Sequence, residues 1–473
     1  MKKFIEDCMG HFQDSIIEAD GKCYRYVEML SQIKIHAIKL KNRMKCKVKC
    51  AILCKSEFNT AMGLLSCLYA GMVAIPLSFN YGKDHYEKVL EFTEPDILIT
   101  DVVDFQYQHV YNLCLSEFFG SCVCNVPEEI LSDISLIMCT SGTTGKPKGA
   151  LITTVALQKN IKAINKYFGL STMDTILIAR PLYHCAVLTG EFLISLSVGA
   201  HIVFLNSKYN PNLLVTYLQR FAITVFCGTP TMLSQISRLV IRSKPVPSIK
   251  KIAISGECLT PKAAHLFLQA FPGVNIYNVY GLTEASPRVS FLPPELFKTY
   301  YCSVGIPIDG VSIKIVDKST GEEQSAGKIG NVMVSSPSLM KSYYREVELT
   351  KKMICSEWLD TNDIGYKDLN GLLYILGRAD GMIIKAGMNI FPCEIEDKVN
   401  QLDEIDECVA YSITKEYGHD IALDVLLVEK RNLEIKELRM KLKTVLPDYL
   451  MPTKVQIVNS IPKNASGKII RKK

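Results

Sequence analysis

The residues with the clearest chemical potential lie in one ten-residue stretch, 140–149, which reads TSGTTGKPKG. It supplies three glycines, four hydroxyl groups and two lysines directly after the apolar stretch SLIMC. Backbone amides, hydroxyl donors and mobile positive charge together suit a polyphosphate. The stretch is not a Walker P-loop, because Pro147 stands five residues after Gly142, where that motif requires glycine. It therefore predicts a phosphate-binding loop of another kind after a buried strand.

Six further motifs follow in order along the chain. They read PLYH at 181–184, SGE at 255–257, YGLTE at 280–284, WLDTND at 358–363, GRADGMIIKAG at 377–387 and PKNASGK at 462–468. Together with TSGTTGKPKG they resemble the adenylate-forming (AMP-binding) superfamily, which includes acyl- and aryl-CoA synthetases, adenylation domains and beetle luciferases. The resemblance runs over about residues 20–471 and so covers nearly the whole chain.

The resemblance implies an ATP and AMP site. The Tyr280 ring would stack on adenine, the Thr283 hydroxyl would touch the α-phosphate, and Glu284 would hold Mg²⁺; each residue type suits its role. The Asp363 carboxylate would accept both ribose hydroxyls, although Asn362 departs from the family's usual glycine. The expected nucleotide-binding set is Thr140, Ser141, Gly142, Thr143, Thr144, Lys148, Ser255, Gly256, Glu257, Asn278, Tyr280, Gly281, Thr283, Asp363, Arg378 and Lys468.

The resemblance also implies which residues act in catalysis and which move. Lys468, His184 and Thr283 are the expected catalytic residues. The long, mobile ammonium of Lys468 would bridge the substrate carboxylate and the α-phosphate and offset charge in the transition state. Asp380 would be the hinge, and Arg378 would pair with ribose or phosphate. The loop facing the thiol channel would be Lys385, Ala386 and Gly387.

The implied reaction has two halves. A carboxylate attacks the α-phosphorus of MgATP to give an acyl-adenylate and pyrophosphate. The thiol of coenzyme A, or of a phosphopantetheine arm on a separate carrier protein, then displaces AMP to give a thioester. No side chain need act as a covalent nucleophile, so catalysis rests on positioning and electrostatics. A rotation of the C-terminal part about the hinge would separate the halves.

The expected acid pocket has apolar walls. Its predicted residues are His184, Cys185, Leu188, Glu191, Cys227, Gly228 and Pro230. They suit an acyl or aryl group. Amino-acid-activating relatives usually carry Asp where Cys185 stands, and an unpaired ammonium in an apolar pocket would be costly. Glu191 nevertheless keeps an amino-substituted acid open.

Three alternatives remain at this point. The chain could be a stand-alone amino-acid adenylating enzyme that loads a carrier protein. It could oxidise its adenylate, as luciferases do. It could also be a non-catalytic nucleotide-binding homologue, but that class predicts loss of residues such as Glu284, Asp363, Arg378 or Lys468, and all four are present. We expect no attached carrier domain, because the chain ends five residues after Lys468.

Short apolar strands alternate with helical patterns over most of the chain. This alternation predicts an α/β fold, with two parallel sheets of βα type. After about residue 303 glycines and short alternating strands predict a distorted β-subdomain. A small α+β domain follows. We expect an adenylation core over residues 1–379 and a mobile C-terminal lid over 380–473, which carries the catalytic lysine.

Composition limits the remaining possibilities. The chain has 473 residues, 48% hydrophobic and 22% charged, with a net charge of +6. The mild positive excess does not indicate a nucleic-acid partner, and no segment reads as a membrane span. The seventeen cysteines are odd in number and scattered, which favours free thiols in a cytoplasmic protein. We expect a monomer or a homodimer.

Overall fold

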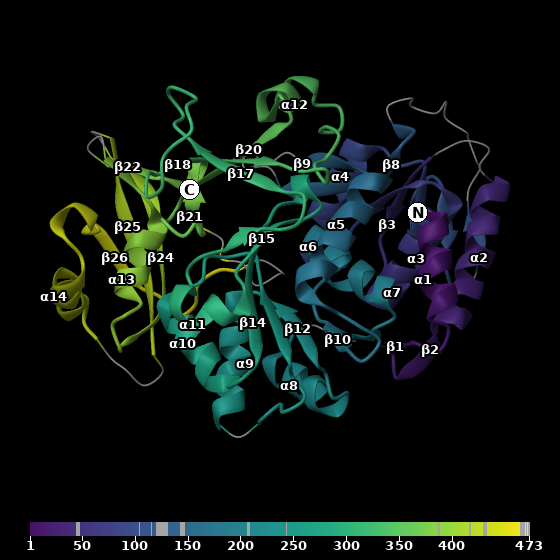
Figure 1. The fold of residues 1–473 in the computed structure, drawn as a ribbon, viewed down its shortest axis with the longest axis horizontal. Coiled ribbons are helices and arrows are strands. Elements are labelled where there is room, and N and C mark those ends of the chain that lie inside the picture. Colours follow the sequence, from purple (N-terminus) through teal and green to yellow (C-terminus); the bar gives the residue numbers. More distant parts are fainter. Residues whose placement is uncertain are drawn as a thin grey trace.

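The computed structural model describes residues 1–43, 48–103, 105–114, 116–119, 131–141, 147–205, 209–242, 244–385, 388–415, 418–428, 433–463, 469 and 471. Among these residues, no helix combines the length and apolar character needed to cross a bilayer. The N-terminal helices and the C-terminal unit lie at opposite ends of the molecule (Figure 1).

A nine-stranded sheet forms the middle of the molecule, with the order β16-β15-β14-β13-β12-β10-β11-β1-β2. The six strands from β14 to β1 run parallel, whereas β2, β15 and β16 are antiparallel additions. Parallel neighbours require crossover connections, and helices supply most of them here. The strands are β1 (Ile16–Ala19), β2 (Lys22–Arg25), β10 (Thr175–Ile178), β11 (His201–Phe204), β12 (Val225–Gly228), β13 (Lys251–Ile254), β14 (Asn275–Gly281), β15 (Arg288–Phe291) and β16 (Ile306–Pro307).

The helices of this layer begin and end at recognisable residues. Thr153 caps α5 (Thr154–Phe168) by accepting from the Ala156 amide, and Gly169 ends it in the left-handed region. Proline occupies the first turn of α8, α9 and α10, where its missing amide costs nothing. These helices span α8 (Pro211–Arg220), α9 (Pro230–Arg242) and α10 (Pro261–Ala270).

A seven-stranded sheet has the order β7-β6-β5-β3-β4-β8-β9. Its strands are β3 (Lys49–Ile52), β4 (Val73–Pro76), β5 (Ile97–Thr100), β6 (Val110–Asn112), β7 (Glu117–Phe119), β8 (Ile134–Ser141) and β9 (Pro147–Thr153). The neighbouring helices are α1 (Lys2–His11), α2 (Tyr26–Arg43), α3 (Glu57–Ala70), α4 (Lys83–Thr93) and the short η1 (Phe79–Tyr81). The β8–β9 pair is antiparallel, so the predicted phosphate loop joins the two strands of a hairpin.

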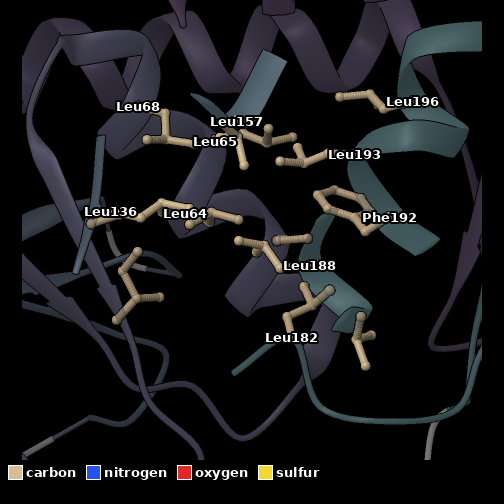
Figure 2. Packing of buried hydrophobic residues seen from close by; sticks show 14 of the residues in the cluster. Leu64, Leu65, Leu68, Leu136, Leu157, Leu182, Leu188, Phe192, Leu193 and Leu196 are labelled. Atoms are coloured by element: carbon tan, nitrogen blue, oxygen red, sulfur yellow. The ribbon is translucent and has the colours of Figure 1, made fainter. Parts of the chain in front are cut away.

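One large core joins the two sheets. Leucines from α3, β8 and α5 pack there against the segment formed by α6 (Cys185–Val187), the π-helical turn η3 (Leu188–Leu193) and α7 (Ile194–Val198). Figure 2 shows Leu188, Phe192 and Leu193 pointing into this cluster toward Leu64 and Leu157. The segment after the PLYH motif is thereby fixed in place by its apolar side chains.

The predicted β-subdomain is a five-stranded antiparallel sheet. It runs β17-β18-β20-β19, with β21 also paired to β20. Its strands are β17 (Ser312–Val316), β18 (Gly330–Ser335), β19 (Ile354–Cys355), β20 (Trp358–Lys367) and β21 (Leu373–Arg378). The helical pieces before and within it are η4 (Thr283–Ala285), η5 (Pro294–Leu296), α11 (Phe297–Tyr300) and α12 (Val347–Met353).

The C-terminal unit begins after the short turn η6 (Ala379–Gly381) and has a core of its own, built from Ile383 onward. Its strands are β22 (Ile383–Lys385), β23 (Met388–Ile390), β24 (Ile405–Lys415), β25 (Gly418–Leu427) and β26 (Lys454–Ile457), and its helices are α13 (Pro392–Val399), α14 (Ile435–Val445) and η7 (Asp448–Leu450). The predicted α/β fold with a smaller C-terminal part is confirmed. The separate core supports the expected boundary at residues 379 and 380, which stays a prediction.

Candidate active site

Three strands bring the predicted ribose and adenine residues together. Tyr280 lies at the end of β14, and its hydroxyl donates to the Asp363 carboxylate on β20, 83 positions later. The β20–β21 register places Arg378 opposite Asp363, with Nη1 3.7 Å from Oδ1. Burial and the charge of Asp363 raise the pKa of Tyr280, so the phenol keeps the proton that it donates. Arg378 Nε lies 3.4 Å from Asp380 Oδ1, so the predicted hinge adjoins this cluster.

Asn362 adopts a backbone conformation that is also readily accessible to glycine. Its φ is +57°, in the left-handed region that asparagine tolerates better than most residues. The Asp360 carboxylate accepts from the Asn362 amide at 2.8 Å and supports this turn. The departure from the family pattern therefore leaves Asp363 in place.

The turn after Tyr280 is held by close packing at Gly281 and by Asn160, a residue outside every motif. A Cβ on Gly281 would lie 2.2 Å from the Pro287 carbonyl oxygen, so only glycine fits there. The buried Asn160 amide on α5 donates to the carbonyls of Ala285 and Arg288 at 3.2 and 3.1 Å. These contacts fix the backbone that carries Thr283 and Glu284.

Tyr343 connects the predicted magnesium ligand to the phosphate-loop hairpin. Its hydroxyl donates to Glu284 Oε1 at 2.6 Å, and its backbone bridges Ala150 on β9. On the same hairpin Thr140 stands opposite Lys148. The structure therefore brings the base of the loop next to Glu284. Ser141 is described in its backbone only, and Gly142, Thr143 and Thr144 lie outside the described residues.

His184 lies in a group of aromatic rings. Its Nε2 is 2.8 Å from the Tyr81 hydroxyl, and His85 Nε2 is 3.1 Å from the Tyr183 hydroxyl. Tyr183 in turn donates to the Cys139 carbonyl of β8 at 2.9 Å. The PLYH segment is thus tied to the strand that leads into the phosphate loop, as a site shared by acid and phosphate would need.

Glu57 at the start of α3 anchors the PLYH segment, and its pKa should differ between the folded and unfolded states. Its carboxylate accepts from the Leu182 amide at 2.9 Å, and burial raises its pKa from 4.5 to about 7. The folded state then holds this proton more tightly than the unfolded chain. Stability should therefore fall as pH rises from about 4.5 to about 7. We expect Glu57→Gln to remove this part of the pH dependence, measured as midpoints of denaturant unfolding from pH 4.5 to 8.

The surface variant Glu322→Gln is the matched control for that experiment, because Glu322 is exposed. Its unfolding midpoint should follow the parent protein at every pH. If the unfolding midpoint of the Glu57→Gln variant changes with pH as steeply as that of the parent protein between pH 4.5 and 7, Glu57 is already ionised in the folded state.

The SGE motif meets the C-terminal segment. Glu257 Oε1 accepts from the backbone amide of Ile469 at 3.1 Å, and Oε2 accepts from the Thr231 hydroxyl at 3.1 Å. Ile469 directly follows Lys468, which lies outside the described residues. Ile469 is therefore placed against the predicted adenine-binding motif. Gly256 between Ser255 and Glu257 has φ +98°, which favours glycine.

Two expected site residues have other partners. The Asn278 amide donates to the carbonyls of Tyr301 and Ser303 at 3.1 and 2.9 Å, so it braces the chain behind the site. Lys385 Nζ donates to the Met451 carbonyl at 3.0 Å and lies 3.3 Å from Asp420 Oδ1. Ala386 and Gly387, the other thiol-channel residues, lie outside the described residues.

Six of the seven expected acid-pocket residues are buried, and the seventh, His184, is half-buried. Cys185, Leu188 and Cys227 belong to the large core, with Gly228 and Pro230 buried beside them. Glu191 is fully buried and forms an ion pair with Arg180, whose guanidinium also approaches Ser255 Oγ at 3.4 Å. Glu191 is therefore already neutralised and does not offer a free counter-ion to a substrate amine. This finding disfavours the amino-substituted acid that the sequence left open.

The site is distinct from a cavity of about 780 Å³ beside α4. That cavity is lined by Tyr86, Phe105, Tyr107 and His109 among others. None of the predicted site residues that the structure describes lines it.

Comparisons with known proteins identify the family. Residues 14–344 match the AMP-binding enzyme family, and residues 394–468 match the AMP-binding enzyme C-terminal domain. The chain belongs to the AMP-binding enzymes. The predicted superfamily is thus confirmed.

Two curated relatives and one solved structure show the range of this similarity. Indoleacetate–CoA ligase of Aromatoleum aromaticum is 30% identical over 86% of this chain and 83% of its own. 2-Succinylbenzoate–CoA ligase of Oceanobacillus iheyensis is 28% identical over 96% of this chain and 94% of its own. The solved structure of o-succinylbenzoate CoA synthetase of Bacillus subtilis, in complex with its acyl-adenylate intermediate, superposes with a TM-score of 0.85. The match covers 99% of this chain and 97% of the synthetase, at 24% sequence identity.

Proposed function

We propose that this AMP-binding enzyme is an AMP-forming acid–CoA ligase. It would join a carboxylic acid to coenzyme A at the expense of ATP. One observation carries the proposal: Tyr280, Asp363 and Arg378 come from three strands and meet in one cluster, joined by a hydrogen bond from Tyr280 to Asp363 and an ion pair between Asp363 and Arg378. Its members are an aromatic ring, a carboxylate and a guanidinium, which suit a base, ribose hydroxyls and a phosphate.

In the first half of the reaction, a carboxylate oxygen of the acid attacks the α-phosphorus of ATP, and pyrophosphate leaves. In the second half, the sulfur of coenzyme A attacks the acyl carbon, the C–O bond breaks, and AMP leaves with that oxygen. We assign Asp363 to the ribose and Thr283 to the α-phosphate. Lys468 would offset charge at the carboxylate and α-phosphate in the first half only.

The chemistry around Glu284 fits magnesium. Among the described residues no group of three metal-binding side chains occurs, so a cage made by protein alone is absent there. Mg²⁺ is commonly held by one or two carboxylates together with substrate phosphates and water, and Glu284 offers one carboxylate beside the phosphate-loop hairpin. When bound, the ion would reduce the negative charge on the phosphates.

Coenzyme A is the acceptor that we favour over a carrier protein. Both curated relatives named above are CoA ligases. An acidic carrier protein remains the alternative acceptor, with its phosphopantetheine thiol in the same chemical role. Supplying each acceptor separately distinguishes them.

The C-terminal unit is proposed to move about Asp380. Among the described residues, the contacts that join it to the core include the Arg238–Asp406 ion pair, a hydrogen bond at 2.6 Å from Lys262 Nζ to the Ile405 carbonyl, and one at 2.8 Å from Cys393 Sγ to the Leu376 carbonyl. The Arg238 contact joins two charged side chains, and the Lys262 contact joins a side chain to the backbone. Contacts of this kind can be exchanged at modest cost in a domain rotation.

Asp380→Pro should trap one domain arrangement, because proline fixes φ near −65°. We expect pyrophosphate release to persist and thioester formation to fall by about 100-fold or more, an effect of the size seen when catalytic groups are mispositioned. Rapid-quench measurement of each half-reaction checks this. Asp380→Ala retains backbone freedom and should keep both halves; unimpaired thioester formation by the proline variant would contradict the hinge.

The activity itself is tested by a screen of carboxylic acids with ATP and Mg²⁺. Pyrophosphate release is measured without an acceptor, with coenzyme A and with a phosphopantetheinylated carrier protein. The proposal predicts an acyl-CoA product for at least one acid. If a thioester forms only on the carrier protein, the carrier protein and not coenzyme A is the acceptor. Oxygen uptake with light emission would indicate a luciferase-like reaction. No pyrophosphate release with any acid would indicate a non-catalytic homologue.

A further inference from the structure

A buried group of charges lies where the predicted acid-binding segments meet. Arg180 follows β10, Glu191 lies in the π-helical turn η3, and Arg288 begins β15. Their exposed fractions are 6%, 0% and 2%. Arg180 donates to one oxygen of Glu191 and lies 3.4 Å from Ser255 Oγ. We call Arg180, Glu191 and Arg288 the buried charge cluster.

Among the residues that the structure describes, three atoms of the buried charge cluster have no hydrogen-bond partner. They are Glu191 Oε2, Arg180 Nε and Arg288 Nε. Buried polar atoms in folded proteins are nearly always paired, so three in one cluster indicate a site completed by something besides the protein chain. Within the part of the chain that the structure describes, Arg288 forms no ion pair with a carboxylate.

The cluster carries an excess positive charge. It contains two guanidinium groups and a single carboxylate. The nearby Tyr167, Cys185 and Cys227 cannot compensate, because burial raises the pKa of each and keeps it protonated and neutral. Burial also raises the pKa of Glu191, against the charges of Arg180 and Arg288. An uncompensated guanidinium in such surroundings is unfavourable unless a ligand brings an anion.

The position of Arg288 links it to the reaction site. In the β14–β15 register it pairs with Gly281 of the YGLTE motif. A Cβ on Gly190 would lie 3.0 Å from Arg288 Nη2, so this glycine makes room for the guanidinium. Gly190 lies within η3, a π-helical turn, and such turns are frequent at functional sites. Leu188 and Phe192 of the same turn point into the apolar core (Figure 2).

We propose that the acid activated by this enzyme is a dicarboxylic acid with an apolar body, whose second carboxylate binds Arg288 in the buried charge cluster. The inference rests on the proposed ligase function and specifies its substrate class. One carboxylate reacts with ATP, and the other supplies the missing negative charge. A simple fatty or aryl monoacid would leave Arg288 uncompensated, and an amino-substituted acid would add a further positive charge.

The test compares each dicarboxylic acid with its own monomethyl ester, which keeps the shape and removes one charge. The series contains straight-chain diacids of increasing length and aromatic diacids, and the readout is kcat/KM for pyrophosphate release. We expect the preferred diacid to exceed its monoester by about 100-fold or more, because a site built for a charged group rejects the analogue lacking it. This comparison needs no variant.

Arg288→Met tests the residue assigned to the second carboxylate. It should lower the diacid-to-monoester ratio about 100-fold, mainly through a raised KM for the diacid, while Arg288→Lys keeps part of the preference. Arg242→Met, an exposed arginine on α9, is the control and should leave the ratio unchanged. A purely structural Arg288 would lower both activities together and leave the ratio intact.

The outcomes separate this inference from the function on which it rests. Equal or faster turnover of monoesters and monoacids overturns the dicarboxylic substrate while the ligase function stands. An Arg288→Met ratio equal to that of the parent overturns it as well. No pyrophosphate release with any acid overturns the ligase function and this inference together.

Discussion

Lys468→Ala should lower pyrophosphate release by about 100- to 1,000-fold, the loss typical when one group that stabilises transition-state charge is removed. The same variant should convert a pre-formed acyl-adenylate and coenzyme A to thioester at nearly the parent rate. In that half no pentacoordinate phosphorus forms, so the ammonium is not needed. Ile469, the next residue, donates its amide to Glu257 of the predicted adenine-binding motif. Each half is measured separately by rapid quench.

Lys454→Ala provides the control, because Lys454 is an exposed lysine on β26 of the same C-terminal unit. It should leave both halves at parent rates. An equal loss of both halves in Lys468→Ala would contradict a lysine that serves adenylation alone. Parent-level pyrophosphate release would show that Lys468 has no part in the chemistry.

Asp363→Asn should raise the KM for ATP by about 10- to 100-fold, the effect of losing one hydrogen bond to a charged acceptor. The carboxylate accepts from Tyr280 and faces Arg378 at 3.7 Å, and in our proposal it also accepts from the ribose. Asparagine can accept from Tyr280 but supplies neither the charge nor the second acceptor oxygen. Unlike Lys468→Ala, this variant should weaken both halves, because the nucleotide stays bound throughout.

Asp360→Asn is the matched control on the same strand. Its side-chain oxygen can still accept from the Asn362 amide, so the left-handed turn is kept. Its KM for ATP should remain within about twofold of the parent value, as expected for a residue without ligand contact. Isothermal titration with a non-hydrolysable ATP analogue gives an independent reading. An unchanged affinity in Asp363→Asn would remove Asp363 from the nucleotide site.

Sequence reasoning located the residues whose chemistry is written in contiguous motifs. Tyr280, Asp363 and Arg378 were expected at one nucleotide, and the fold brings them together from strands far apart in the chain. The alternation of strands and helices predicted the two largely parallel sheets, because that pattern follows from local periodicity. The departure at Asn362 is explained by its positive φ.

Residues that act through long-range packing could not be found in this way. Tyr343 reaches Glu284 from 59 positions away, and Asn160 braces the Arg288 backbone from 128 positions away. Neither lies in a motif. Arg288 followed a recognised motif, but only its burial beside Gly190 and Glu191 indicates a charged site. The pairing of Glu191 with Arg180 likewise depends on tertiary contact and changed the expected role of Glu191.

The most direct test of the central claim follows an oxygen atom. The accepted acid is labelled with ¹⁸O in its carboxylate and turned over with ATP, Mg²⁺ and coenzyme A, and the products are analysed by mass spectrometry. An acyl-adenylate route transfers one labelled oxygen to AMP and gives AMP, pyrophosphate and acyl-CoA in equal amounts. Label in inorganic phosphate with ADP as the nucleotide product, or unlabelled AMP, would contradict it.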